Sequence, residues 1–368
     1  MQVALKVERT ALSSLSDTDN LFQSDFWGRF KSRYGWQPRG FAVDTGTSGG
    51  EVRVLALVRE LSSGLKVAYV PYGPDVDLSE EDYGLFLEAL SGELERHLPE
   101  GTVFVRFDLP WPSPYGRGRP GTARPGTVRH GAPRPAHRVR ELRMNFGTRR
   151  RNLRKAPSDT LPVDTVIVDL TEDESALLSQ MRSKTRYNVR LSKRRGVRVD
   201  QADSAEIARW YRLYDRTTRR HRIVRYGLEY FREMMSLAER NAPSGPDLRL
   251  LLARDEEEIL AGIILVLMGR HSSYLYGASS ARKRWAMPAY RLQWRAMQIA
   301  KANGCLTYDL FGIPPTDTPS HPMHGLYRFK TGFGGAVLHR MGCWDFPFLP
   351  ELYRRCREEE LGSPGYHR

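Results

Sequence analysis

The sequence predicts an α/β protein with two domains. The chain has 368 residues, and two domains are expected at roughly 100 to 200 residues per domain. Hydrophobic residues make up 40% of the chain, which is enough to build sizeable cores. In both halves, apolar runs of strand length alternate with amphipathic stretches of helical length. The pattern therefore favours one mixed α/β unit in each half.

The first unit is expected within residues 1–160. Predicted helices cover 26–31 and 78–97, and predicted strands cover 52–58, 65–69 and 102–109. Residues 111–140 then change character, because they are rich in Pro, Gly and Arg and contain no Asp or Glu. Such a composition cannot build a core, and we predict an insertion at 111–160. It is either a basic arm for RNA or anionic lipid headgroups, or a tolerated loop.

The second unit is expected within residues 161–345. Predicted helices are 174–195, 204–218, one starting near 228, and 288–303. Predicted strands are 165–170, 248–254, 259–268, 272–277, 305–311 and 336–341. Pro288 suits the first position of its helix, and Gly304 suits the position after its end. Both halves begin with strand, helix and strand, although their sequences show no repeat.

The predicted helix at 174–195 carries positive charge along one row. Its expected inner stripe, at spacings of three and four, is Leu178, Met181, Thr185 and Val189. Its basic ridge, at a spacing of four, is Arg182, Arg186, Arg190 and Arg194. No acidic residue lies between Glu174 and Asp200, whereas a solvated helix face usually mixes both signs. The ridge therefore favours contact with a polyanion, and a solvated face is the alternative.

Bulk charge points the same way. Lys+Arg number 57 against 43 Asp+Glu, so the net charge is +14, and the pI is about 9.8. This surplus favours nucleic acid, anionic lipid or phosphorylated partners, and peripheral membrane contact is one expectation. The N-terminus lacks the apolar stretch of a secretory signal, and no run of 18 apolar residues occurs. We therefore expect a cytoplasmic protein.

Several familiar motifs are absent or misplaced. Residues 116–121 match GxGxxG but lie in the proline-rich insertion, and Gln37–Ala42 resembles an acyl-CoA pyrophosphate loop yet does not open a helix. His321 and His324 have a metal-like spacing but no completing ligands. The three cysteines have no CxxC spacing and are expected to be free thiols. We predict no metal and no cofactor.

The most informative stretch surrounds Lys330. This lysine lies between Phe329 and Phe333, and glycines follow at 332, 334 and 335. Glycines allow close backbone approach, so the lysine would be a fixed cation beside a docking place for a ligand. Such a cation stabilises developing negative charge. The alternative is a glycine-rich hairpin with a solvated lysine.

Taken together, the motifs resemble those of the FemABX-type aminoacyltransferases over most of both halves. The segments that carry the resemblance are LFQS (21–24) with Trp27 and Lys31, YVPYGP (69–74), 181–199, YLYGAS (274–279), AYRLQW (289–294), YDLFG (308–312), Phe329–Lys330 and GCWD (342–345). The resemblance implies two tandem GNAT-like acetyltransferase-type domains, with the tail 346–368 packing on the first. No sustained heptads occur, so a coiled-coil arm is not expected.

The resemblance also implies a reaction. Aminoacyl-tRNA would be the donor, acting as a co-substrate. The acceptor would be an amine on the stem peptide of a UDP-MurNAc-peptide or a lipid-linked peptidoglycan precursor. Lys330, with Phe329 beside it, would face the reacting ester, and Tyr276 would line the acceptor groove. Lys31, Arg220 and Arg225 would bind the diphosphate.

Attack of an amine on the ester builds an oxyanion, which a fixed lysine stabilises. The ammonium must also lose a proton, and Asp108 and Asp309 are weak candidates for the base. The basic ridge would bind the tRNA acceptor arm. Two alternatives stay open: a GNAT-fold acyltransferase that uses acyl-CoA, and a non-catalytic basic protein that binds RNA or membrane. The transferred amino acid, the choice between soluble and lipid-linked acceptors, and the oligomeric state stay unassigned.

Overall fold

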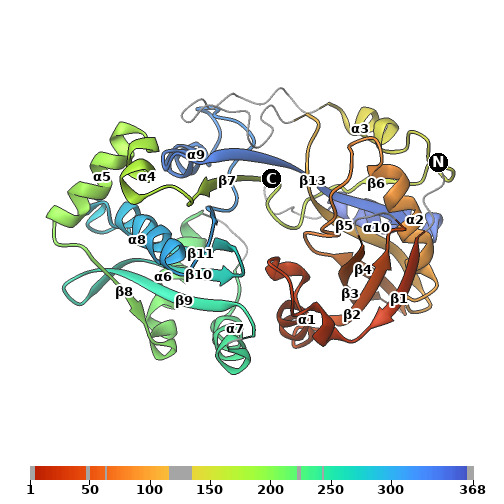
Figure 1. The fold of residues 1–368 in the computed structure, drawn as a ribbon, viewed down its shortest axis with the longest axis horizontal. Coiled ribbons are helices and arrows are strands. Elements are labelled where there is room, and N and C mark those ends of the chain that lie inside the picture. Colours follow the sequence, from red (N-terminus) through yellow and green to blue (C-terminus); the bar gives the residue numbers. More distant parts are fainter. Residues whose placement is uncertain are drawn as a thin grey trace. The chain divides into compact units, whose positions relative to one another are not determined.

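The chain folds into two compact units in a computed structural model (Figure 1). The structure describes residues 5–46, 50–62, 64–115, 135–221, 225–242 and 244–362. Within these, unit 1 contains the residues up to 115 together with 135–163 and 339–362, and unit 2 contains 164–338. The GxGxxG match, most arginines of the predicted insertion and residues 222–224 lie outside the described residues.

Unit 1 is built on a mixed sheet. Its strands are β1 (Lys6–Thr10), β2 (Gln37–Asp44), β3 (Glu51–Ser62), β4 (Leu65–Val70), β5 (Thr102–Pro112), β6 (Arg154–Lys155) and β13 (Ala336–Pro347), whose first residues belong to unit 2. The strand order is β1-β2-β3-β4-β5-β13, with β6 paired to β13. Strands β4 and β5 are parallel, whereas the other pairs are antiparallel.

Four helices accompany this sheet: α1 (Asp25–Ser32), α2 (Tyr83–Glu95), α3 (His137–Met144) and α10 (Pro350–Gly362). Short 3₁₀ turns cover Leu12–Leu15 and Leu21–Gln23. Helix α1 begins where the Ser24 hydroxyl accepts a hydrogen bond from the Trp27 N–H. Helix α2 provides the crossover between parallel strands β4 and β5 and buries Phe86 and Leu90 against the sheet.

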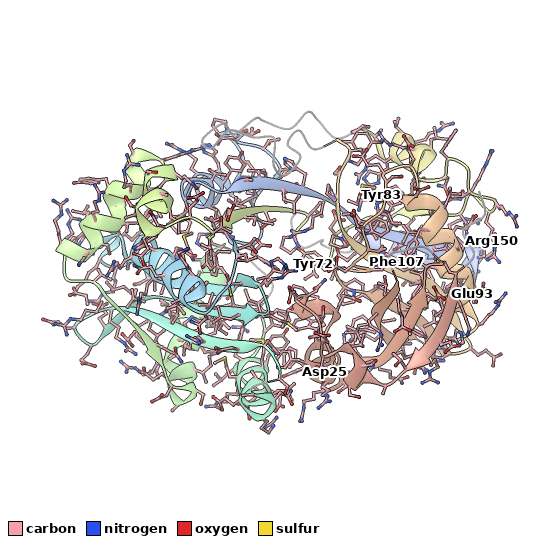
Figure 2. The ribbon with its side chains drawn as sticks, in the orientation of Figure 1. Asp25, Tyr72, Tyr83, Glu93, Phe107 and Arg150 are labelled. Carbon is pink, nitrogen blue, oxygen red and sulfur yellow. The ribbon has the colours of Figure 1, made fainter. Side chains whose placement is uncertain are left out.

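The C-terminal helix α10 is held by unit 1. Its Tyr353 ring packs edge-on against Phe104, at 5.2 Å between centroids. Arg106, largely buried, forms bidentate hydrogen bonds with Asp345 and reaches Glu360 at 2.8 Å. These contacts join β5, β13 and α10 within one core (Figure 2 labels the buried Phe107 of β5).

The predicted insertion at 111–160 is wrong in its second half. Residues 135–160 form α3 and β6, and Met144 and Leu153 belong to the hydrophobic core of unit 1. Asn145 fixes this segment, because its side-chain amide donates to the Glu141 and Leu153 carbonyls and its oxygen accepts from the Leu153 N–H. The composition of the segment did not predict this packing, because two core residues among many arginines are enough to anchor the segment.

Unit 2 is also a mixed sheet. Its strands are β7 (Asp164–Asp169), β8 (Arg198–Ala202), β9 (Asp247–Asp255), β10 (Glu258–Met268), β11 (His271–Ser279) and β12 (Thr307–Asp309), in the order β7-β12-β11-β10-β9-β8. Strands β11 and β12 are parallel. Its helices are α4 (Glu174–Gln180), α5 (Ser183–Arg194), α6 (Ile207–His221), α7 (Leu228–Asn241), α8 (Pro288–Ala302) and α9 (His324–Thr331), with 3₁₀ turns at Ser204–Glu206 and Arg284–Ala286.

The helices of unit 2 cover both faces of β8–β11 (Figure 1). Val189 of α5 and Met297 of α8 pack with Ile263 and Leu265 of β10 in one core cluster. On the opposite face, Gly262 of β10 lies so close to Trp210 of α6 that a Cβ would come within 2.5 Å of its ring. Both units thus share one order: four antiparallel strands, a crossover helix and a parallel strand. The predicted α/β class is confirmed.

Three expectations about elements in unit 2 need correction. The single helix predicted at 174–195 is two helices, because Met181 adopts an extended conformation between α4 and α5. The stretch before the glycines is not a hairpin but helix α9, which carries Lys330. Strand β12 is shorter than predicted, and β8 was not predicted. In the part of the chain that the structure describes, no helix has the length and apolar character needed to cross a bilayer.

Candidate active site

Lys330 is a buried lysine in the last turn of α9. Lys330 is only 5% exposed. The ammonium donates hydrogen bonds to the carbonyl oxygens of Gly312, at 2.8 Å, and Phe311, at 3.2 Å. It also lies 5.1 Å from the centre of the Tyr274 ring. Two carbonyl dipoles and an aromatic face therefore hold this cation in one place.

This environment lowers the pKa of the Lys330 ammonium to near neutral pH. Burial lowers the pKa of Lys330 from 10.5 to about 7, and the charge of Asp309 opposes that shift. Burial also raises the pKa of Tyr274 to about 12, so its hydroxyl stays protonated. At neutral pH the Lys330 amine is thus able to take up or give up a proton, whereas Tyr274 is not.

The backbone that receives the lysine has an unusual conformation. Phe311 has a φ of +60°, which is uncommon for a residue with a side chain. Asp309 stabilises this turn, because its carboxylate accepts a hydrogen bond from the Phe311 N–H at 2.7 Å and another from the Thr165 hydroxyl. The YDLFG segment therefore turns its carbonyls toward α9, and Asp309 is occupied in holding that turn.

The glycines after Lys330 allow close packing within unit 2. A Cβ on Gly332 would lie 2.3 Å from the Thr185 hydroxyl. Gly334 has a φ of +90°, and a Cβ there would lie 2.7 Å from the Gln180 carbonyl oxygen. The glycines therefore permit the close approach of α4 and α5 to this segment, and a ligand docking place beside Lys330 stays a prediction.

Phe329 belongs to an aromatic cluster beside the lysine. Its ring lies 4.9 Å from Tyr290 of α8 and 5.3 Å from Phe333, edge-on in both cases. Phe333 is fully buried. Phe329 thus fixes α9 against α8, and the structure gives it a positioning contact rather than a reactive group.

Tyr276, the predicted acceptor residue, lies on the opposite face of the sheet from Tyr274. Their i, i+2 spacing would normally place both on one face. A bulge in β11 changes this, because Ile264 pairs with Tyr276 whereas Leu265 pairs with Tyr274, leaving one extra residue between them. The bulge directs Tyr274 toward Lys330 and Tyr276 toward α6 and α7. No sequence signal marked this bulge.

Tyr276 belongs to a cluster of aromatic side chains from β11, α6 and α7. Its hydroxyl lies 3.1 Å from that of Tyr230, whose ring stacks on Tyr226 at 4.1 Å. Phe231 and Tyr214 pack edge-on against Tyr276 at 5.2 and 6.5 Å. Sequence reasoning singled out only one member of this cluster. The tyrosines 226 and 230, four residues apart, were a signal that could have located it.

The two arginines predicted to bind a diphosphate are both exposed and lie near this cluster's helices. Arg225 forms an ion pair with Asp215, which also accepts Arg219 at 3.0 Å. Arg220 donates to the Ser279 carbonyl at 3.0 Å. Each arginine therefore keeps further N–H donors with which it could bind a phosphate.

Lys31, the third predicted diphosphate ligand, belongs to unit 1 at the end of α1. Its ammonium lies 5.7 Å from the Trp27 ring centre. Burial lowers the pKa of Lys31 to about 8, and the positive charge of Arg59 adds to this effect. The charge of a bound anion would raise the pKa of Lys31 and so oppose both effects.

The predicted basic ridge is divided by the structure. Arg186 points toward α4, where its guanidinium donates to the carbonyls of Leu178, Ser179 and Met181 at 3.0–3.2 Å. It therefore closes the end of α4. The exposed cations of this surface are Arg182, Lys184, Arg190, Lys193, Arg194 and Arg195.

Two exposed aromatic rings lie among these cations. Tyr187 is 54% exposed, and Arg194 lies 5.8 Å from its ring centre. Trp285 is 57% exposed, and Arg195 lies 5.0 Å from its ring centre. We call the six cations with Tyr187 and Trp285 the α5 surface. Cations interleaved with open aromatic faces suit a nucleic acid with unpaired bases.

Both candidate bases are held by hydrogen bonds within their own units. Asp108 is fully buried, and its Oδ2 accepts hydrogen bonds from the Tyr69 hydroxyl and the Leu161 N–H, both at 2.9 Å. Burial and the nearby Asp159 raise the pKa of Asp108 to about 6. Such enclosure favours a structural role in unit 1. Asp309 holds the turn at Phe311, as described above.

The set-aside motifs have structural explanations. Gln37–Asp44 is strand β2, paired with β1 and β3, so its amides serve the sheet rather than a pyrophosphate. His324 opens α9 and lies 2.7 Å from the Asp317 carboxylate. The cysteines at 305, 343 and 356 are free thiols.

Comparison with known proteins gives a family. The model of the FemAB family matches residues 6–242 and 249–358. The lipid II:glycine glycyltransferase of Staphylococcus aureus (strain bovine RF122 / ET3-1) is 28% identical over 155 residues, or 41% of this chain and 35% of that protein. The match thus spans about a third of that relative's length. The family resemblance read from the sequence is confirmed.

One solved structure shares the fold of this chain. The crystal structure of FemX matches with a TM-score of 0.75 at 17% identity, covering 96% of this chain and 100% of that one. A tandem GNAT protein from the clavulanic acid biosynthesis pathway matches with a TM-score of 0.48 at 11% identity, covering 93% and 98%. The FemX match confirms the predicted fold.

Proposed function

Because the chain belongs to the FemAB family, we propose that it is an aminoacyltransferase of peptidoglycan precursors. It moves an amino acid from aminoacyl-tRNA to an amine on the stem peptide. The Staphylococcus aureus relative is named a lipid II:glycine glycyltransferase, which favours a lipid-linked acceptor over a soluble UDP-MurNAc-peptide. We place the reaction in the cytoplasm, where charged tRNA is made.

The proposed reaction needs one proton to move. The acceptor amine attacks the ester carbonyl, a C–N bond forms, and the C–O bond to the terminal ribose breaks. The amine loses a proton, and the leaving ribose oxygen gains one. Negative charge develops on the carbonyl oxygen in between. The ester is already activated, so no covalent enzyme intermediate and no cofactor are required.

The observation that carries the proposal is the buried ammonium of Lys330. Two of its three N–H groups bond to the Phe311 and Gly312 carbonyls, and the third suits the oxyanion. With a pKa of about 7, the neutral form of Lys330 takes the proton from the attacking ammonium, and the ammonium so formed donates to the oxyanion and passes the proton to the leaving oxygen. Lys330 is thus the proposed proton-transfer group, because Asp108 and Asp309 are held by hydrogen bonds within their own units.

The α5 surface supports tRNA as the donor. Its exposed cations bind phosphates without regard to sequence, and Tyr187 and Trp285 offer faces on which unpaired bases stack. An acceptor arm ends in unpaired nucleotides, so it needs both features. In this assignment Arg182, Arg190 and Arg194 bind RNA, whereas Arg186 contributes by holding α4 against α5.

The acceptor assignments rest on the family resemblance and on local geometry. Tyr276 and its aromatic neighbours form a face for the sugar or peptide part of the precursor. Lys31, Arg220 and Arg225 are proposed to bind the diphosphate that both precursor types contain. Arg225 has further N–H donors for that phosphate besides the one that contacts Asp215.

The test is transfer from a mixed pool of charged tRNA, read by mass spectrometry. Lipid-linked precursor and UDP-MurNAc-pentapeptide are offered in parallel reactions. We expect a mass gain of one residue that requires tRNA and is larger on the lipid-linked acceptor. Lys330→Met, which keeps the length of the side chain, should abolish it. Acyl transfer from acyl-CoA without tRNA would contradict the proposal.

A further inference from the structure

Helix α3 presents a row of large apolar side chains to solvent. Val139 is 51% exposed, Leu142 is 68% exposed, and Phe146, just beyond the helix end, is 83% exposed. The residues follow at spacings of three and four, so they line one side of the helix and its terminal turn. A contiguous apolar row of this kind on a protein surface marks an interaction site.

The row is not needed to hold α3 in place. The opposite side of the helix does that, because Met144 is buried in the core of unit 1. Asn145 bonds to the Leu153 backbone through both its amide and its oxygen, and the Glu141 carboxylate accepts from the Lys155 N–H at 3.0 Å. The orientation of α3 is thus fixed with Val139, Leu142 and Phe146 outward.

Positive charge surrounds the row. Residues 137–154 contain a single carboxylate, Glu141, and seven arginines. These are Arg138, Arg140, Arg143, Arg149, Arg150, Arg151 and Arg154. Arg143 pairs with Glu80 at 2.9 Å and Arg150 with Glu95 at 3.4 Å, and Figure 2 shows Arg150 at the periphery of unit 1. Glu88 of α2 also lies against this segment, because it accepts hydrogen bonds from the Arg149 and Arg150 N–H groups. Together with Glu141, Glu80 and Glu95 it makes four carboxylates against seven arginines, and Arg138 and Arg151 are exposed.

We propose that this face of α3 docks on an anionic membrane surface. Phe146, Leu142 and Val139 enter the headgroup boundary, and the surrounding arginines contact lipid phosphates. An amphipathic helix with apolar and arginine-rich sides is suited to that boundary. A second copy fits less well, because a two-fold interface would set the same arginines against each other.

This inference goes beyond the proposed function and does not depend on it. Vesicle binding requires no substrate and no catalysis. If both hold, docking brings the enzyme to the surface on which a lipid-linked acceptor resides. Soluble acceptor turnover then stays unchanged when the α3 row is altered, since none of its residues belongs to the candidate active site.

The experiment is co-sedimentation of the full chain with vesicles. Phosphatidylcholine vesicles are compared with vesicles that contain phosphatidylglycerol, at low and high salt. The variant is Leu142→Ser with Phe146→Ser, and the matched control is Leu61→Ser, which alters a 47% exposed leucine on β3. We expect wild type and control to bind anionic vesicles in a salt-sensitive way, and the double variant to bind about tenfold more weakly. Unchanged thermal unfolding of the variant shows that it is folded.

Three outcomes would overturn the proposal. The first is no binding of wild type to anionic vesicles. The second is equal binding by the double variant. The third is a concentration-dependent dimer in sedimentation velocity that the double variant loses, which would assign the row to a second copy instead. Arg138→Glu should separately weaken binding and reduce its salt dependence, and an unchanged salt dependence would contradict the role of charge.

Discussion

Replacing Lys330 by Met should separate the stability of unit 2 from its activity. The folded chain holds this lysine with a pKa of about 7, whereas the ordinary value is 10.5. Between these values the unfolded state binds more protons than the folded state, so stability rises with pH across this window. Below pH 7 the cost of burial is fully present, and above pH 10.5 it has vanished.

The magnitude follows from the size of the shift. Each pKa unit corresponds to about 1.4 kcal/mol, so the whole shift corresponds to about 5 kcal/mol. Between pH 7 and pH 9, the free energy of unfolding of wild type should therefore rise by about 2 kcal/mol. Lys330→Met has no lysine at this position, so its stability should show no such rise. The methionine also leaves the Phe311 and Gly312 carbonyls without this donor, but that cost does not vary with pH.

The assay is urea unfolding of both proteins at several pH values between 7 and 9, followed by tryptophan fluorescence. The stability of Lys330→Met relative to wild type should fall by about 2 kcal/mol over this range. Lys301→Met is the matched control, because Lys301 also donates to two backbone carbonyls but is only partly buried. A stability difference between Lys330→Met and wild type that stays constant with pH would refute the idea that burial lowers the pKa of Lys330 to about 7.

Three further results are expected. Gly334→Ala should lower stability by about 1–3 kcal/mol, because its φ is +90° and the new Cβ meets the Gln180 carbonyl; unchanged thermal unfolding would contradict this. Arg186→Ala should destabilise by about 1–2 kcal/mol, whereas Arg190→Glu should leave stability unchanged, weaken tRNA binding and flatten its salt dependence, as measured by filter binding. Asp108 has a pKa raised to about 6, so wild type should lose roughly 2 kcal/mol of stability as the pH rises from 4 to 7, relative to Asp108→Asn; parallel urea curves would argue against it.

The sequence predicted the parts of the fold that depend on local pattern. Apolar runs such as 259–268 identified β10, and Pro288 and Gly304 marked the ends of α8. The predicted inner stripe is confirmed in part: Met181, Thr185 and Val189 are buried, whereas Leu178 is half-buried and Leu177 is the buried residue of α4. Met181 also breaks the predicted helix in two. Local periodicity cannot report such a break, because the stripe continues across it.

The parts of the site that sequence did not reveal depend on tertiary contacts. The β11 bulge separates Tyr274 from Tyr276, and only the pairing with β10 shows it. The positive φ of Phe311 and its support by Asp309 likewise require the fold. Lys330 was singled out because aromatic residues and glycines surround it in the sequence, and the fold shows that those glycines pack against α4, α5 and β7. Its role in the reaction stays a prediction.

The most direct test of the central claim is the pH dependence of single-turnover transfer from charged tRNA to a lipid-linked precursor, for wild type, Lys330→Arg and Lys330→Met. The account predicts a tRNA-dependent mass gain whose rate changes with an apparent pKa near 7 in wild type and is lost with Met. Lys330→Arg keeps a charged group but loses the pKa near 7. It should therefore retain at most a residual rate with a different pH dependence. Wild-type rates in Lys330→Met would contradict the assignment of the buried lysine as the group that stabilises the transition state.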